Sequence, residues 1–392
     1  MRLKNKTYNK STMLVNVGRN SANHYGSVNT PVYRTSTVLF ENIQLLRSSM
    51  VEKKQGVVYG RFGTPTTFSF EEAIANIEGE GQSVATSSGK AAIVASLLSF
   101  LESGDHLLMV DCVYGPTRTF ATNILSKFGI KTTFFDPEIG TNIKNLIKKN
   151  TKLIYLESPG SLTFEIQDIK AISKIAKKFK IITIVDSTWA TPIFFKPLKL
   201  GIDISIHAAT KYIVGHSDAM LGVITTRPEI HKLVRSTAHA LGASPGSDDL
   251  FLGLRGLRTL DIRLKKHQDN AKKLIEFLKS QPEVKNILYP AYTKSKGYNI
   301  WKKNYSGASG LFGVELKNYN QKLIDHFINT LDLFGIGYSW GGFESLIIQS
   351  QLKNIRSNNI WNDRVILRIH AGLENHNDLI ADFKNALMVF KK

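Results

Sequence analysis

One lysine stands in a setting suited to covalent chemistry. The stretch "IHAATKYIVGHSDAMLG" (206–222) places Lys211 directly after a threonine, at the end of an apolar run. Glycine, histidine, serine and aspartate follow within a few residues. A desolvated amine is a good nucleophile toward carbonyl carbon. We therefore expect Lys211 to be held as a reactive amine rather than as a surface charge.

If that amine carries pyridoxal phosphate as a Schiff base, the cofactor's ring nitrogen needs an anion that keeps it protonated. Asp186 ends the apolar run "IITIVD", 25 residues before Lys211. A buried carboxylate without a partner is costly, so Asp186 is the candidate anion. The alternative is a structural one, in which Asp186 caps the following "STW" turn.

The phosphate needs backbone N–H groups at a helix N-terminus. "ATSSGKAAIVAS" (85–96) is a serine–glycine turn that opens into an alanine-rich helix, with Ser88, Gly89 and Lys90 at the turn. The stretch is not a nucleotide-binding P-loop, because Val84 occupies the position of the first glycine and Ala91 that of the hydroxyl residue.

An aromatic and an arginine complete the set. "DCVYGPTRTF" (111–120) places Tyr114 beyond a strand end, where it could stack on a ring, although such a tyrosine more often packs in the core. "VILRIHAGLE" (365–374) places Arg368 inside an apolar strand. An arginine fork binds a carboxylate in two-point fashion, so Arg368 is the candidate for a substrate carboxylate. A structural ion pair is the alternative. No residue pattern predicts a metal site.

The elements around these residues predict an α/β fold. Short β-branched runs alternate with helical stretches at 116–128, 141–149 and 168–179, which is typical of a mostly parallel sheet covered by helices on both faces. The predicted strands are 106–111, 131–136, 152–158, 181–186, 203–208 and 221–226. Ligands of such sheets bind beyond the carboxyl ends of the strands, where Asp111, Glu157, Asp186 and His207 stand.

Length and composition narrow the class of protein. A chain of 392 residues with 42% hydrophobic residues predicts a globular protein of two domains. The net charge of +19 comes from lysines spread over many helical stretches, so we expect no nucleic-acid partner. The single cysteine, Cys112, and the lack of a long apolar run predict a cytoplasmic protein that does not enter a membrane.

Together these stretches resemble the cystathionine β-lyase branch of the Cys/Met-metabolism family of pyridoxal-phosphate enzymes. The resemblance covers nearly the whole chain and rests on landmarks that are specific only in combination. They are "VVYGRFGTPTT" (57–67), "SSGKAA" (87–92), "ESPGSLTFEI" (157–166), "VDSTWA" (185–190), "ATKYIVGHSDAM" (209–220), "LRGLRTL" (254–260), "YSWGGFESL" (338–346) and "LRIHAGLE" (367–374).

The resemblance implies the aspartate-aminotransferase-type fold (fold type I), with a mostly parallel seven-stranded sheet between helices. It implies an N-terminal arm at 1–58 that reaches a neighbouring subunit, a cofactor-binding domain at 59–252, and a smaller α+β domain at 253–392. A homo-oligomer follows, expected to be a tetramer built as a dimer of dimers, with each active site shared by two subunits.

The resemblance also implies residue roles. Lys211 would hold the cofactor and move protons, Asp186 would pair with the ring nitrogen, and Tyr114 would stack on the ring. The phosphate would be bound by Ser88, Gly89, Lys90 and Thr210, and by Tyr59 and Arg61 of the neighbouring subunit. The substrate would be bound by Arg368, Ser339, Trp340 and Tyr59.

The implied activity is cleavage of L-cystathionine at its β-carbon, with release of homocysteine, pyruvate and ammonia for methionine biosynthesis. Relatives that act at the γ-carbon usually read "SATK" and "SLGGVESL", whereas this chain has Ala208 and Trp340 at the distinctive positions. A γ-synthase or γ-lyase is the alternative activity, and a binding protein that has lost its chemistry is the alternative class. Alanine lacks a leaving group, so we expect its racemisation as a side activity, with Tyr114 as the second acid.

Overall fold

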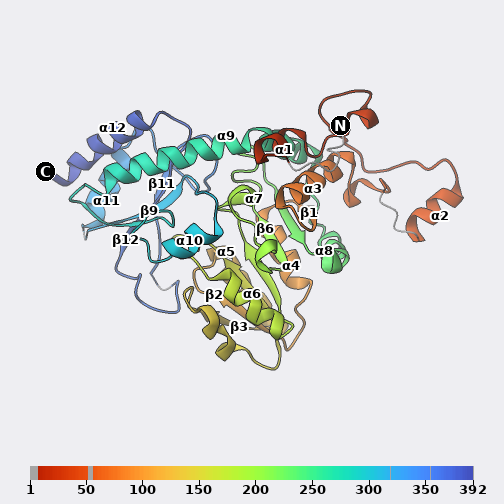
Figure 1. The fold of residues 1–392 in the computed structure, drawn as a ribbon, viewed down its shortest axis with the longest axis horizontal. Helices are drawn as coiled ribbons and strands as arrows, with labels where there is room; N and C mark the ends of the chain where they lie inside the picture. Colours follow the sequence, from red (N-terminus) through yellow and green to blue (C-terminus); the bar gives the residue numbers. More distant parts are fainter. Residues whose placement is uncertain (1–7, 52–55, 318, 354, 392) are drawn as a thin grey trace.

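The computed structural model describes residues 8–51, 56–317, 319–353 and 355–391. It contains a seven-stranded sheet and a five-stranded sheet, and the long helix α9 (Ser247–Leu278) runs past both (Figure 1). Among the described residues, no helix is long and apolar enough to cross a membrane.

The larger sheet confirms the predicted fold class. All six predicted strands are present, and their order in the sheet is β1-β7-β6-β5-β4-β2-β3. Four neighbouring pairs are parallel, and only β7 runs antiparallel to its neighbours β1 and β6. The strands are β1 (Gln82–Thr86), β2 (His106–Val110), β3 (Lys131–Phe135), β4 (Thr151–Glu157), β5 (Ile182–Asp186), β6 (Ile204–His207) and β7 (Gly222–Thr226).

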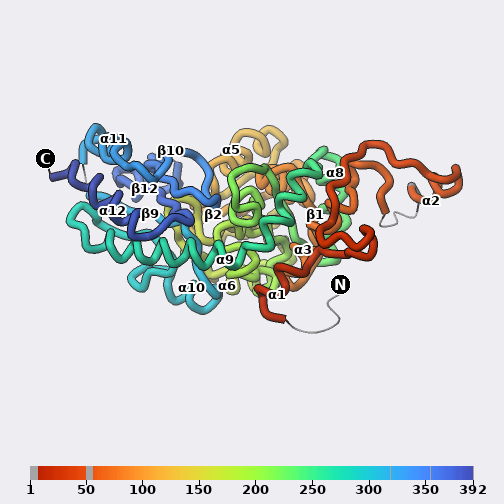
Figure 2. The backbone as a smooth tube through the Cα atoms, turned by 90° about the horizontal axis from the view of Figure 1, so that it is seen from above, coloured from red at the N-terminus to blue at the C-terminus, as the bar shows by residue number. Residues whose placement is uncertain are grey.

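Helices cover both faces of this sheet, with α5 and α8 on one side and α6 on the other (Figure 2). The predicted helix at 116–128 is shorter than expected and continues as a 3-10 turn at Leu125–Phe128. The helical stretch predicted at 141–149 is present as a 3-10 helix, Gly140–Leu146. The helices are α3 (Pro65–Glu78), α4 (Gly89–Leu98), α5 (Gly115–Asn123), α6 (Ile169–Lys178), α7 (Thr191–Phe194) and α8 (Pro228–Ala240).

The second sheet has the order β10-β11-β12-β9-β8. Its elements are β8 (Val284–Leu288), α10 (Tyr298–Asn304), β9 (Leu311–Leu316), α11 (Gln321–Thr330), β10 (Gly335–Ile336), β11 (Leu346–Gln349), β12 (Val365–His370) and α12 (His376–Ala386). Helix α9 begins at Ser247, ten residues before Leu257, where the sequence stretch "LRTLDIRLKKHQDNAKKLIEFLKS" (257–280) first indicates a long helix, and Asp248 and Asp249 lie in its first turn. Acidic residues in the first turn stabilise a helix N-terminus through its dipole.

The N-terminal residues form extended segments and two short α-helices, α1 (Lys10–Asn16) and α2 (Ile43–Val51). Helix α1 packs on α9, where Arg258 Nη1 donates to the carbonyls of Leu14 and Val17 at 2.7 and 2.8 Å. The part that carries α2 projects beyond α8 (Figures 1 and 2). Three of its apolar side chains, Leu39, Ile43 and Leu45, are exposed, and Leu39 is 90% accessible.

Candidate active site

The carboxyl ends of β4 and β5 place two buried acids side by side. Glu157 and Asp186 are register partners in the parallel ladder. Asp186 Oδ1 accepts hydrogen bonds from Thr188 N at 2.9 Å and Thr188 Oγ1 at 2.5 Å, and its Oδ2 has no partner among the described residues. Burial raises the pKa of Asp186, while Thr188, His207 and Lys211 oppose the rise. The His207 ring contacts a different carboxylate, because its Nε2 lies 2.7 Å from Glu78 Oε1.

Lys211 follows β6 and lies at the junction of the two sheets. Its Nζ donates to Ser339 Oγ, 128 residues away, and lies 5.3 Å from the ring centroid of Trp340. Burial lowers the pKa of Lys211 to about 8, helped by the Arg368 charge and opposed by Asp186. A substantial fraction of this amine is therefore neutral near pH 8, as a nucleophile or proton acceptor requires.

The loop with Ser339 and Trp340 is pressed against the backbone of Lys211. Ser339 and Gly341 have φ of 79° and 88°, in the left-handed region. A Cβ on Gly341 would lie 3.1 Å from Lys211 Cα and 2.9 Å from the Tyr212 nitrogen, so only glycine fits this approach. Gly341 N donates to His370 Nε2 at 3.1 Å, which ties the loop to β12.

Arg368 projects from β12 toward the same place. Its Nη2 donates to the carbonyls of Ser339 at 2.9 Å and Gly337 at 3.4 Å. Burial lowers the pKa of Arg368 to about 10, partly offset by Tyr114 and Tyr338. The guanidinium thus stays charged at neutral pH in a partly desolvated site, where it can bind a carboxylate.

Tyr114 stands at the N-cap of α5, and its side chain is 45% accessible. Its backbone N–H donates to Glu157 Oε2 at 2.7 Å. Burial and the nearby acids Glu157 and Asp186 raise the pKa of the Tyr114 phenol, and Arg368 opposes them. The protein's own groups therefore act against the lowered pKa that a second proton-transfer role would require.

The predicted phosphate-binding turn, Ser88 to Lys90, lies at the N-terminus of α4. Ser88 is the N-cap, and its Oγ accepts from Ala91 N at 3.1 Å. The N–H groups of Gly89 and Lys90 open the helix, where no intrahelical partner exists. A Cβ on Gly89 would lie 2.5 Å from Ala208 Cβ, so this turn packs directly on the segment before Lys211.

Two side chains that were predicted to help bind the phosphate form hydrogen bonds to other parts of the chain. Lys90 Nζ donates to the carbonyl of Pro116 and lies 4.9 Å from the Phe120 ring centroid. Thr210 Oγ1 accepts from Leu221 N at 2.8 Å and donates to Leu221 O at 3.1 Å.

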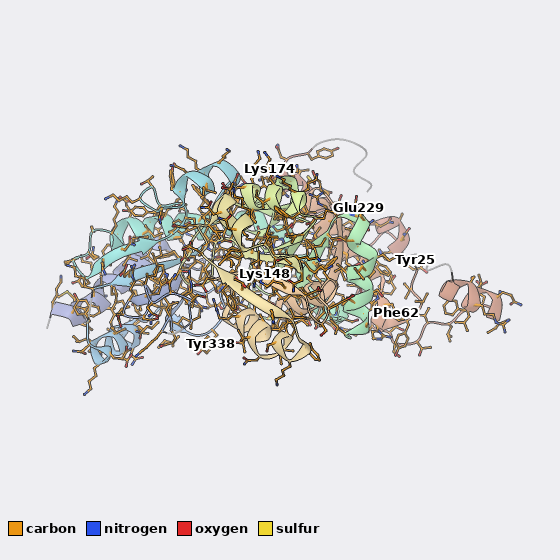
Figure 3. All side chains as sticks on the ribbon, turned by 90° about the horizontal axis from the view of Figure 1, so that it is seen from below. Tyr25, Phe62, Lys148, Lys174, Glu229 and Tyr338 are labelled. Atoms are coloured by element: carbon orange, nitrogen blue, oxygen red, sulfur yellow. The ribbon has the colours of Figure 1, made fainter. Side chains whose placement is uncertain are left out.

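Tyr59 and Arg61 do not join these residues within one chain. Arg61 Nη1 donates to His239 O at 3.0 Å, and its guanidinium lies 4.4 Å above the Phe62 ring. Phe62 lies near α8 in Figure 3, well separated from Tyr338, the residue before Ser339. A site that uses Tyr59 and Arg61 therefore needs a second chain.

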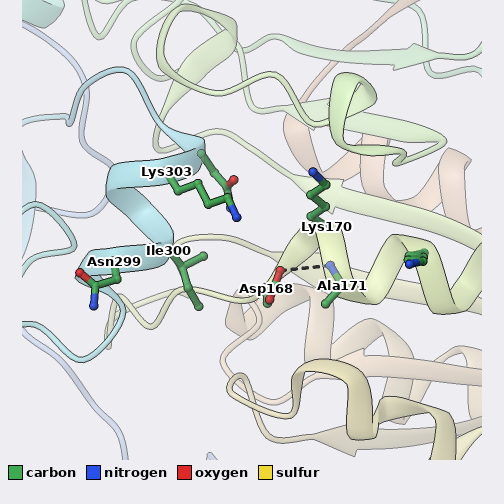
Figure 4. Close-up of a pocket in the computed structure, with 8 residues that line it drawn as sticks. Asp168, Lys170, Ala171, Asn299, Ile300 and Lys303 are labelled. Carbon is green, nitrogen blue, oxygen red and sulfur yellow. Dashed lines mark hydrogen bonds between the residues drawn. The ribbon is translucent and has the colours of Figure 1, made fainter.

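Sequence reasoning named Glu157 as a polar strand end but missed its contact with Tyr114, and it missed Gly341 and His370 altogether. A surface hollow of about 390 Å³ lies elsewhere, between α6 and α10, and contains none of the predicted site residues (Figure 4). Its lining includes Asp168, the N-cap of α6.

Comparison with known proteins is consistent with this geometry. A family model described as Cys/Met metabolism PLP-dependent enzyme matches residues 11–388. The chain is 39% identical to cystathionine beta-lyase MetC of Escherichia coli, over 95% of this chain and 96% of the relative. It is also 39% identical to an L-alanine/L-glutamate racemase of Wolbachia pipientis, over 96% of both chains.

A solved structure from Campylobacter jejuni that carries N'-pyridoxyl-lysine-5'-monophosphate superposes with a TM-score of 0.89. It is 30% identical in sequence, over 97% of this chain and 100% of the other.

Proposed function

The chain belongs to the Cys/Met metabolism family of PLP-dependent enzymes, and we propose that within this family it is a carbon–sulfur β-lyase. L-cystathionine and water would give homocysteine, pyruvate and ammonia. The observation that carries the proposal is the meeting of the Lys211 amine with Ser339, Trp340 and Arg368 at the junction of the two sheets. The similarity to cystathionine β-lyases over nearly the full length supports it.

The residues present fit pyridoxal phosphate. Lys211 is a buried amine with a lowered pKa, and Asp186 offers a buried carboxylate whose Oδ2 has no partner in the described chain. The start of α4 offers the N–H groups of Gly89 and Lys90 to a phosphate. When bound, the cofactor supplies an aldehyde for amines and a ring that accepts electrons.

The side chains divide the remaining work. Arg368 binds the substrate carboxylate and also donates a hydrogen bond to the Ser339 carbonyl. The same guanidinium therefore positions both the substrate and the Ser339–Trp340 loop. The Lys211 amine removes the proton from the substrate α-carbon and can return it, because it is neutral in part near pH 8. With the cofactor bound, Tyr114 would stack on its ring, and Asp186 would keep the ring nitrogen protonated.

We propose that Thr210 and Ser88 assist the phosphate, and that the Lys90 side chain does not, since it is bound to Pro116. Tyr59 and Arg61 would reach the site of a neighbouring subunit. The exposed apolar arm around α2 supports this, because it has little of its own chain to pack on. The proposed units are an arm at 1–58, a cofactor domain at 59–252 and an α+β domain at 253–392, of which residues 1–7, 52–55, 318, 354 and 392 lie outside the described residues.

We also propose a homotetramer built as a dimer of dimers, and a cytoplasmic location. The one cysteine, Cys112, is buried and free, which suits a reducing compartment.

The test is the identity of the keto acid made from L-cystathionine. A β-lyase releases pyruvate and homocysteine, whereas a γ-lyase releases 2-oxobutanoate and cysteine. We expect pyruvate, and 2-oxobutanoate as the main product would favour the γ-type alternative. Neither product, in a protein that shows the cofactor's visible absorbance, would reject both.

Alanine racemisation is a second candidate activity, and the similarity to the Wolbachia racemase favours it. Alanine has no leaving group, so proton return to the α-carbon is its productive fate. Lys211 serves one face, and Tyr114 is the candidate acid for the other. Incubation of L-alanine in heavy water with wild type and Tyr114→Phe tests this. Deuterium uptake with full retention of the L configuration in wild type would reject a two-base mechanism.

A further inference from the structure

A buried ion-pair network lies beside the active site and contains no residue to which a cofactor- or substrate-binding role is assigned above. At its centre is Asp111, which follows β2 and is 2% accessible. Its carboxylate accepts from Arg118 Nη2 at 2.5 Å and from Arg356 Nε at 3.0 Å. Ser357 adds its N–H at 3.0 Å and its hydroxyl at 2.7 Å.

Arg356 extends the network to a second loop. Its Nη1 donates to Thr163 Oγ1 at 2.9 Å and its Nη2 to Glu165 Oε1 at 3.1 Å. With Asp111, Arg118, Glu165 and Arg356 the network holds two negative and two positive charges, so it is electrically balanced. A buried arginine with every branch of its fork engaged is geometrically demanding, and lysine could not replace it contact for contact.

The network connects the two halves of the active site. Asp111 and Arg118 flank Tyr114, and Arg118 lies in the first turn of α5, which Tyr114 caps. Arg356 and Ser357 lie between β11 and β12, the strand that carries Arg368. Among the described residues, Arg356 and Ser357 provide the hydrogen bonds between the 111–118 turn and the five-stranded half of the molecule.

We propose that Arg356 and Ser357 form a latch that positions Tyr114 opposite Arg368. The two side chains come from different sheets, yet both must face one substrate. Small displacements of such groups lower rates sharply, by about a hundredfold for 1 Å. The latch places the Tyr114 turn relative to β12, so Arg356 and Ser357 are positioning residues. This inference rests on the proposed function for its kinetic consequences only.

The experiment compares Arg356→Met, Arg356→Lys and Ser357→Ala with a matched control, Arg364→Met. Arg364 belongs to the same segment and pairs with the buried Glu315 at 3.5 Å, but Glu315 lies in β9 of the same sheet. The control thus removes an arginine–carboxylate pair that does not reach the Tyr114 turn. Amide hydrogen exchange is measured on peptides that cover 111–120, together with kcat, KM, Tm and the cofactor's visible absorbance.

We expect faster amide hydrogen exchange at 111–120 in Arg356→Met and Ser357→Ala, although the substituted residues lie about 245 positions from this segment in the sequence. We expect no change in exchange at 111–120 in Arg364→Met. We expect kcat/KM for cystathionine to fall roughly 10- to 100-fold in Arg356→Met and by a smaller factor in Arg356→Lys. In the control, Arg364→Met, we expect no fall in kcat/KM even if its Tm drops as much as that of Arg356→Met. Unchanged exchange at 111–120, or equal kinetic losses in Arg356→Met and Arg364→Met, would overturn the latch.

If Arg356→Met does not fold, Ser357→Ala and Arg356→Lys decide the question, because each keeps most of the network. If wild type makes no pyruvate from cystathionine, the proposed activity fails, while the exchange comparison still decides whether the latch exists.

Discussion

Arg368 offers the sharpest test of the proposed chemistry, through Arg368→Met. The change keeps an apolar stem of similar length and removes the guanidinium. In the structure that guanidinium already holds the carbonyls of Ser339 and Gly337, so its loss affects both the substrate carboxylate and the loop against Lys211.

The magnitude follows from both effects. Removing the partner of a buried, hydrogen-bonded charge costs about 2–5 kcal/mol, and an unpaired buried carbonyl adds about 1 kcal/mol or more. The combined loss is about 3–6 kcal/mol, which is a fall in kcat/KM of about 10²- to 10⁴-fold at about 1.4 kcal/mol per tenfold.

The assay is steady-state pyruvate release from L-cystathionine, with the cofactor's visible absorbance recorded on the same sample. We expect the absorbance to be retained, because Lys211, Asp186 and the start of α4 are unchanged. Arg368→Lys should recover only part of the activity, since a lysine cannot form the two-point contact. A kcat/KM within threefold of wild type in Arg368→Met would refute the assignment of Arg368 to the substrate.

The other predictions use separate parts of the site. The rate at which the cofactor-free protein takes up pyridoxal phosphate should rise with pH through about 8, the pKa of Lys211, and a rate flat from pH 6 to 10 would contradict the lowered pKa. Below pH 8 Lys211 is charged although buried, which destabilises the folded protein, and this destabilisation vanishes above pH 10.5, the usual pKa of lysine, where the amine is neutral in both the folded and the unfolded chain. Lys211→Met should therefore raise the Tm of the cofactor-free protein at pH 7 but not at pH 11. Mixed oligomers of inactive Lys211→Ala and inactive Arg61→Ala chains should regain activity through one hybrid site, and inactive hybrids with demonstrated subunit exchange would refute a shared site. Asp186→Asn should reduce kcat far more than Glu157→Gln does, because Asp186 is the proposed anion beside the ring nitrogen. Equal losses of kcat in the two variants would refute the assignment of the negative charge to Asp186.

Local sequence patterns predicted the elements well where burial is continuous. The β-branched runs of β2 and β4–β7 stand out because both faces of these strands are covered. β1 escaped prediction because "QSVAT" is short and carries small polar residues. The helical stretch predicted at 141–149 takes the tighter 3-10 conformation at Gly140–Leu146, which its glycine and two asparagines favour.

The site itself was only partly accessible to such reasoning. Lys211, Asp186 and Tyr114 follow strand ends, and the topology of a parallel sheet brings strand ends together. The contact between Lys211 and Ser339 spans 128 residues and depends on the left-handed turn at Ser339 and Gly341, which no local pattern announces. Those residues entered through family resemblance. In the Arg356 network only Asp111 had a signal, as a polar strand end, because its partners Arg118, Glu165 and Arg356 are single charges in segments far apart in the sequence.

The surroundings of Glu157 and Asp186, the two acids at the sheet edge, determine which of the two carboxyl groups is ionised. Glu157 and Asp186 are neighbours in register, and two adjacent buried carboxylates cannot both ionise without a large cost. Asp186 receives two bonds from Thr188 and the favourable influence of His207 and Lys211, so its ionised form is supported. Burial and Asp186 hold the pKa of Glu157 well above its usual range, against a bond from the Tyr114 N–H and one from Ser161. We therefore propose that Glu157 is the neutral acid that positions Tyr114 and that Asp186 is the anion available to a protonated ring nitrogen.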